Sequence, residues 1–194
     1  MTAEDARLRR AREGDLAAFN ELVLEFEGPV FNLCLRMLGQ RQAAEDAAQE
    51  AFIAAWRHIS TLRGESFRPW MLRIAANLCR DELRRRGRRP AVSLESALEA
   101  GVPEPAEAAA PPESVALNSE LRGQIEAALR QLPEEQRLAL VLADVQGLDY
   151  QEVAAVMRTS LGTVKSRIAR GRARLRQLLT AAAELPPAGV RHGD

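Results

Sequence analysis

Cysteine, histidine and aromatic residues are scarce in this chain of 194 residues. The two cysteines, Cys34 and Cys79, are too few for a disulfide framework, and with only two histidines beside them no metal-ligand spacing arises. Aromatic residues make up 4% of the chain and β-branched residues are sparse, which argues against a β-sandwich or a β-barrel. We therefore expect no metal, no cofactor and no catalytic residue.

Long apolar runs are also missing. None approaches the roughly 18 residues that a membrane span needs, and no signal peptide opens the chain. These features predict a cytoplasmic protein without membrane insertion. Hydrophobic residues account for 46% of the chain and charged residues for 28%, and alanine and leucine are abundant, which favours a globular helical protein of one domain or two small ones.

The formal net charge of +0 conceals an uneven distribution. Residues 63–89 hold nine arginines against three acidic residues, and residues 158–176 hold seven basic residues and no acidic one. Residues 90–120 between them hold six glutamates and no lysine or arginine. Two dense basic blocks in a neutral chain indicate contact with a polyanion at two places, although solvated helix faces are the alternative.

Five prolines between Pro90 and Pro112 mark a flexible, acidic Pro/Ala linker, because helices stop at such residues. The sequence thus predicts an all-α protein of two small helical domains, residues 1–89 and 117–180, with a linker at 90–116 and a tail at 181–194. In the second domain Asp149 and Glu152 form a capping-box pattern before a short helix at 150–157. A tight segment and a longer basic helix from Leu161 follow it, as in a helix-turn-helix.

Three side-chain stripes stand out at helical spacing. The first suits a protein interface or an ordinary wet face, and it consists of Asp46, Gln49, Glu50 and Ile53. The second suits phosphates and base edges, and it consists of Arg73, Asn77, Arg80 and Arg84. The third lies on the last helix, where base edges and phosphates would meet it, and includes Thr163, Lys165, Ser166, Arg167, Ala169 and Arg170.

Four segments in order resemble one family, the bacterial RNA polymerase sigma factors of the extracytoplasmic-function group (group IV). They are DLAAFNEL (residues 15–22), AEDAAQEAFIAAW (44–56), SFRPWMLRIAAN (66–77) and GTVKSRIARGR (162–172). The resemblance covers nearly the whole chain apart from the linker and the tail. One departure is Ala169, which is small where relatives often carry a larger side chain.

The resemblance implies a role for each part. The domain 1–89 would be sigma region 2: its first stripe would bind the clamp helices of the β′ subunit of core RNA polymerase, and its second would recognise and melt the −10 promoter element. The loop 60–66 would hold a base flipped out of the duplex. The domain 117–180 would be sigma region 4 and would read the −35 element as duplex DNA.

The resemblance also implies further contacts. The β subunit and an anti-sigma factor would be partners besides promoter DNA. The acidic linker would thread through the polymerase, with Glu95, Glu99, Glu104, Glu107 and Glu113 imitating nucleic acid. Two other functions stay open on the residues alone: an autonomous helix-turn-helix repressor, and an interaction protein that sequesters an anti-sigma factor as a decoy.

Overall fold

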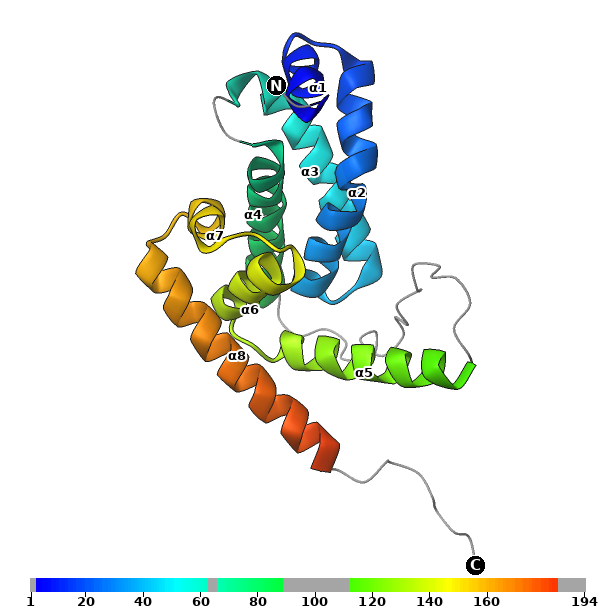
Figure 1. The fold of residues 1–194 in the computed structure, drawn as a ribbon, viewed down its shortest axis with the longest axis vertical. Helices are drawn as coiled ribbons and strands as arrows, with labels where there is room; N and C mark the ends of the chain where they lie inside the picture. The colour runs from blue at the N-terminus through cyan, green and yellow to red at the C-terminus, as the bar shows by residue number, and fades with distance from the viewer. Residues whose placement is uncertain (1–2, 63–65, 89–111, 185–194) are drawn as a thin grey trace, which may run out of the picture.

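The computed structural model describes residues 3–62, 66–88 and 112–184, and these ranges are built from helices without strands (Figure 1). Residues 63–65 of the predicted base-holding loop, residues 90–111 of the predicted linker and residues 185–194 of the predicted tail lie outside these ranges. Within them, no helix has both the length and the apolar character needed to cross a bilayer. The all-α prediction is confirmed.

The N-terminal half, residues 3–88, consists of α1 (Ala3–Arg12), α2 (Leu16–Leu38), α3 (Arg41–His58), a 3-10 turn η1 (Ile59–Thr61) and α4 (Phe67–Arg88). Asp15 caps α2 by accepting a hydrogen bond of 3.0 Å from the Ala18 amide. Gly39 ends α2 in the left-handed region at φ 71°, which glycine adopts without strain. Pro29 lies inside α2, which continues through the position where the sequence predicts a kink or a break.

The C-terminal half, residues 112–184, consists of α5 (Pro112–Arg130), α6 (Glu134–Leu140), a π-helical segment η3 (Val141–Val145), α7 (Tyr150–Met157) and α8 (Leu161–Glu184). Helix α5 begins five residues before the predicted domain start at Leu117, because a proline is well tolerated in the first turn of a helix. Helix α8 continues to Glu184, past the predicted end at residue 180. The helix that begins as α6 widens into η3 before Gly147 turns the chain at φ 67°.

The core of the N-terminal half lies between α2, α3 and α4. Phe67 packs on Phe26 and Trp70 with ring centroids 5.2 and 5.8 Å apart, and Trp70 is buried, as the sequence favours. Cys34 and Cys79 are free thiols buried in this core, as predicted. Contact with Cys34, together with burial, raises the pKa of Cys79, which keeps it a protonated packing residue.

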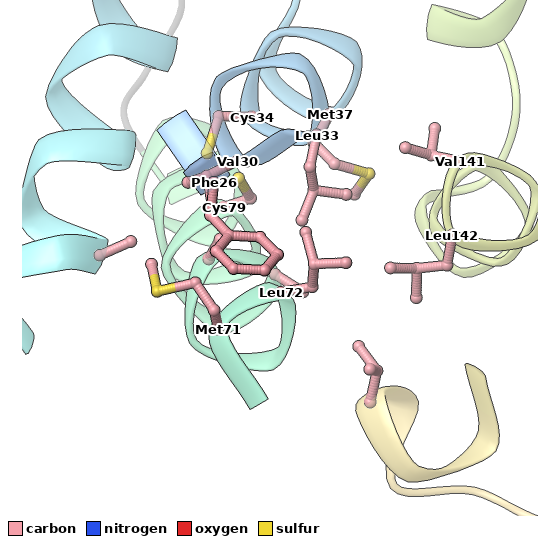
Figure 2. Packing of buried hydrophobic residues seen from close by; sticks show 14 of the residues in the cluster. Phe26, Val30, Leu33, Cys34, Met37, Met71, Leu72, Cys79, Val141 and Leu142 are labelled. Carbon is pink, nitrogen blue, oxygen red and sulfur yellow. The ribbon is translucent and has the colours of Figure 1, made fainter. Parts of the chain in front are cut away.

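The two halves pack against each other instead of standing apart. Figure 1 shows α6 and α7 beside α4, and Figure 2 shows Val141 and Leu142 of η3 facing side chains of α2 and α4. Leu33, Met37 and Leu72 on the N-terminal side are each at most 1% exposed. One hydrophobic cluster therefore runs through both halves, and we call their contact the seam.

Candidate protein- and nucleic-acid-binding surfaces

The predicted acidic stripe lies on the outer face of α3. Asp46, Gln49 and Glu50 are exposed, and Ile53 is 39% exposed. The opposite face of the helix buries four alanines, Ala44, Ala48, Ala51 and Ala55, so α3 approaches its neighbours closely and presents its polar side outward. The exposure that the sequence predicts for all four stripe residues is thus observed.

A groove of about 340 Å³ runs beside this stripe, between α3 and α4. Its apolar lining comes from Ala43, Ala47 and Leu78, and four acidic side chains and one basic side chain, Arg85, surround it. Two of these, Asp46 and Glu50, belong to the predicted stripe; the other two, Asp81 and Glu82, were missed, although they are the only adjacent acids in an otherwise basic block. An apolar hollow with acidic walls suits a helical element that carries basic and apolar side chains.

Glu82 is one of the four acidic residues that surround the groove, and it remains ionised. Burial opposes its charge, but hydrogen bonds from Arg86 and Arg85 outweigh that cost and lower its pKa. Arg86 Nε donates to Glu82 Oε1 at 2.7 Å. The groove therefore keeps its acidic character at neutral pH.

The basic stripe on α4 is divided between solvent and the seam. Asn77 and Arg84 are exposed, and Arg84 donates to Asp81 at 3.1 Å. Arg73 is half-buried. Arg80 is only 12% exposed, because Glu134 and Glu135 at the start of α6 lie against it.

The seam explains why Arg80 differs from its neighbours. Arg68, Leu72, Ala76 and Arg80 follow one another at spacing i+4, so they form a row along one side of α4. Arg68 donates to the main-chain oxygen of Gln146, and Leu72 faces Leu142 (Figure 2). Arg80 is the residue at which this row meets the basic stripe.

The C-terminal half holds the helix-turn-helix that the sequence predicts. Asp149 accepts hydrogen bonds of 2.8 Å from the amides of Gln151 and Glu152, and Glu152 accepts one of 2.9 Å from the Asp149 amide. This capping box fixes the start of α7. Arg158 then takes the left-handed conformation at φ 50° and turns the chain into α8.

The outer face of α8 carries the third stripe. Ser160 Oγ caps the helix by accepting from the Thr163 amide at 3.1 Å. Lys165, Ala169 and Arg170 are exposed, and Arg170 donates to Ser166 Oγ at 3.0 Å. Thr163 and Ser166 are half-buried. Leu161, the first residue of α8, is 38% exposed, whereas Val164 in the same turn is fully buried.

Two arginines of α8 are held by acids from other helices. Arg167, 24% exposed, lies 2.8 Å from Glu135 Oε2. Arg172 donates to both carboxylate oxygens of Asp144, at 3.1 and 2.6 Å, and this bidentate pair raises its pKa. The fork geometry shows that these guanidinium groups are placed to hold oxyanions.

Two further polar contacts cross the seam, and helical periodicity did not predict them. Arg137, half-buried, donates to the Met37 carbonyl oxygen at 2.7 Å, and burial lowers its pKa. Gln146 donates to the Pro29 carbonyl oxygen at 2.8 Å. At 5% exposure, Gln146 is the one buried polar residue among the described residues. A single glutamine within an apolar run was the one signal that could have indicated such a contact.

No group of three or more histidine, cysteine or acidic side chains that could hold a metal ion occurs in the described ranges. The arrangement that is present consists of one acidic groove and two basic helix faces. Such surfaces are typical of binding to proteins and nucleic acids.

Comparison with known proteins connects both halves to transcription. Residues 22–89 match the family model for Sigma-70 region 2, and residues 122–175 match the model for Sigma-70, region 4. The RNA polymerase sigma-H factor of Pseudomonas aeruginosa is 40% identical over 169 residues, which cover 85% of this chain and 88% of the relative. The ECF RNA polymerase sigma-E factor of Escherichia coli K12 is 39% identical over 169 residues, with the same coverage of 85% and 88%.

Two solved structures share the fold. The structure of CnrH in complex with the cytosolic domain of CnrY superposes with a TM-score of 0.68 at 27% identity and covers 93% of this chain and 99% of that one. The sigma factor RpoE in complex with the anti-sigma factor NepR from Bartonella quintana gives a TM-score of 0.66 at 24% identity, over 84% and 96% of the two chains.

Proposed function

Because the chain belongs to the extracytoplasmic-function (ECF) family of RNA polymerase sigma factors, we propose a division of labour among the surfaces described above. The chain binds core RNA polymerase and directs it to promoters, where transcription starts. The observation that carries this function is the presence of both sigma regions in one chain, in order, each with its exposed polar stripe. A sigma factor supplies binding energy and catalyses no reaction of its own, and this one works in the cytoplasm, where the polymerase is.

The N-terminal half is proposed to bind the β′ clamp helices through Asp46, Gln49, Glu50 and Ile53. The groove between α3 and α4 supports this assignment, since its acidic walls and apolar lining complement a basic amphipathic helix. The sequence-based prediction named the acids of α3, Asp46 and Glu50. The groove has two further acids on α4, Asp81 and Glu82.

The basic stripe of α4 is proposed to contact the −10 element. Exposed Asn77 and Arg84 offer a base-reading amide and a phosphate-binding guanidinium, and Arg73 and Arg80 complete the row. The third stripe, on α8, is proposed to enter the major groove of the −35 element. There Thr163, Ser166, Ala169 and Arg170 would meet base edges, while Lys165 and Arg167 would meet phosphates.

An anti-sigma factor is a further proposed partner, and the fold shared with the sigma factor RpoE, whose structure contains the anti-sigma factor NepR, supports it. The β subunit of the polymerase is a further expected contact. An autonomous repressor and a decoy remain weaker alternatives, since neither requires an acidic groove beside a DNA-binding stripe.

The test reverses the charge of the α3 stripe. The double variant Asp46→Lys and Glu50→Lys should lose binding to core polymerase in a pull-down and lose promoter-specific transcripts, while its unfolding free energy changes by no more than about 0.5 kcal/mol for each exposed site. A control with the same charge change on exposed α2 residues, Glu21→Lys and Glu27→Lys, should keep both activities. Unchanged core affinity in the α3 variant would show that this face is wrongly assigned.

A further inference from the structure

One carboxylate at the seam joins the two faces that are proposed to bind DNA. Glu135 Oε1 lies 2.9 Å from Arg80 Nη2 of α4, and Glu135 Oε2 lies 2.8 Å from Arg167 Nη1 of α8. Glu134 adds a second acid, 3.5 Å from Arg80 Nε. A single acidic pair at the start of α6 therefore contacts one arginine from each of the two basic stripes.

These contacts exclude DNA from both arginines. A guanidinium group holds a carboxylate or a phosphate through the same fork of N–H donors, so the two ligands compete for one position. Arg80 is 12% exposed and Arg167 24% exposed while Glu135 holds them. Neither can reach a phosphate until the acidic pair moves away.

The contact is also incompletely satisfied. Arg80 Nε is buried and has no hydrogen-bond partner among the described residues, although Glu134 lies within ion-pair distance. A buried donor without a hydrogen bond costs free energy, which partly offsets the attraction of the charges. Such a bridge suits a contact that opens and closes better than one that serves stability alone.

We propose that Glu134 and Glu135 act as an internal phosphate mimic, which keeps the DNA-binding arginines of regions 2 and 4 occupied while the chain is free of polymerase. This inference rests on the proposed function, because it assigns Arg80 and Arg167 to DNA. The acids stand in the first turn of α6, where the helix dipole favours negative charge. Separating α6 from α4 when polymerase binds would release Arg80, whereas Arg167, which lies in the same half as Glu135, would be released when a DNA phosphate takes the place of the carboxylate.

The experiment measures DNA binding by the full chain without polymerase. The probe is a fluorescein-labelled 30-base-pair duplex of mixed sequence, followed by fluorescence anisotropy over a range of salt concentrations. Glu134→Gln with Glu135→Gln removes the charges and keeps the side-chain shape. We expect its affinity to rise at least tenfold, and the slope of log K against log[salt] to steepen by roughly 1.8, because two more phosphates would be neutralised.

The control removes two acids elsewhere. Glu13→Gln with Glu27→Gln changes the net charge equally, at exposed positions away from α6. It should leave both affinity and salt slope close to those of the unaltered chain. If the α6 variant and this control behave alike, the acidic pair does not compete with DNA and the proposal fails.

A second measurement covers the case in which the α6 variant folds poorly. Glu135→Gln alone keeps both arginines and leaves Glu134 beside Arg80, so it should raise salt-sensitive binding by a smaller factor than the double variant. No rise at all, in a variant with an unchanged circular dichroism spectrum, would equally overturn the proposal. The proposed function is judged separately, by promoter-specific transcription with core polymerase, so either can fail without the other.

Discussion

Asp15 fixes the start of α2 with its carboxylate. Oδ1 accepts from the Ala18 amide at 3.0 Å, and Oδ2 accepts from Arg10 Nε at 2.9 Å. The hydrogen bond from Ala18 and then those from Arg10 lower the pKa of Asp15 below its ordinary value of 3.8. Because the folded pKa is lower than the unfolded one, the stabilisation is complete above the unfolded pKa and disappears as the pH falls through the folded pKa.

This gives a prediction for pH dependence. Asp15→Asn keeps a capping oxygen and removes the charge, so it should be less stable than the unaltered chain by a constant amount from about pH 7 down to about pH 5, well above the ordinary carboxyl pKa. The difference should shrink below that range and vanish near about pH 2, where both chains carry a neutral cap. Urea unfolding at each pH measures it. If the difference in unfolding free energy between the two chains persists at the lowest pH, it comes from the shape of the side chain and not from its charge.

Single residues were predictable from sequence where one helix decides their environment. Asp46, Gln49 and Glu50 are exposed, and Cys34 and Cys79 are buried, as helical periodicity predicts. Arg80 belongs to the same basic stripe as Asn77, yet it lies against α6. A helical wheel describes one helix and carries no information on a partner 55 residues further along the chain.

At the scale of elements, Gly171 sets how closely α8 packs on α6. It is buried, and a Cβ at this position would stand 3.0 Å from Leu140 Cδ1, 3.1 Å from Leu140 Cγ and 3.4 Å from the Gln136 main-chain oxygen. Leu140 is 2% exposed and packed on its other sides, so it has little room to move. The helix–helix contact therefore depends on the missing side chain.

Gly171→Ala should consequently destabilise the C-terminal half. Overpacking costs about 1–3 kcal/mol, which exceeds the gain of up to ~1 kcal/mol that alanine brings to a helix. Gly123→Ala is the control. Gly123 is helical like Gly171, but it is exposed, and no atom lies within 4 Å of the added Cβ. Denaturant unfolding should show a loss for the first variant and a gain of up to ~1 kcal/mol for the second. If both variants were more stable than the unaltered chain, Leu140 would have to move aside to make room for the added methyl group.

The ends of helices could be predicted from the sequence where a capping residue or a glycine with positive φ is required. Asp149 with Glu152, Gly39 and Gly147 stand where the sequence places a start or an end, because each satisfies a capping or positive-φ requirement. Gly87 lies inside α4, which continues to Arg88, although glycine often follows the end of a helix. The π-helical turn of η3 was not predicted, since it arises from packing at the seam and not from a residue type.

At the scale of the molecule, the closed arrangement accounts for the uneven charge. Acidic residues of α6 lie between the two basic blocks, so a chain of net charge +0 places its opposite charges in contact. Opening this arrangement exposes Val141 and Leu142 to solvent unless a partner covers them. A partner can shift the equilibrium only by as much as it prefers the open form, so core polymerase must bind that form more tightly.

The seam itself could not be predicted from the sequence. Helical periodicity describes the faces of one helix at a time, so it does not say which other helix covers Leu33, Leu72 or Leu142. The sequence therefore predicted two domains, correctly, and gave no reason to expect that they share a cluster. Only the fold brings residues more than 60 positions apart together, such as Leu72 and Leu142 (Figure 2).

A shared cluster predicts that the free chain unfolds as one unit. Leu22 is fully buried in α2, two helical turns before Pro29, and it belongs to the N-terminal half. Leu22→Ala should cost about 2–5 kcal/mol for the lost contacts and the cavity. Trp56 and Trp70 both lie in the N-terminal half, so tryptophan fluorescence measures that cost there.

The decisive measurement is amide hydrogen exchange in α7, at Val153 and Val156 of the C-terminal half. If both halves unfold together, Leu22→Ala should lower the protection of these amides by the same free energy that tryptophan fluorescence reports. Unchanged protection in α7 would show instead that each half unfolds alone and that the seam contributes little. In that case the acidic pair of α6 would be holding together two independently stable domains, and separating them would demand correspondingly less of the polymerase.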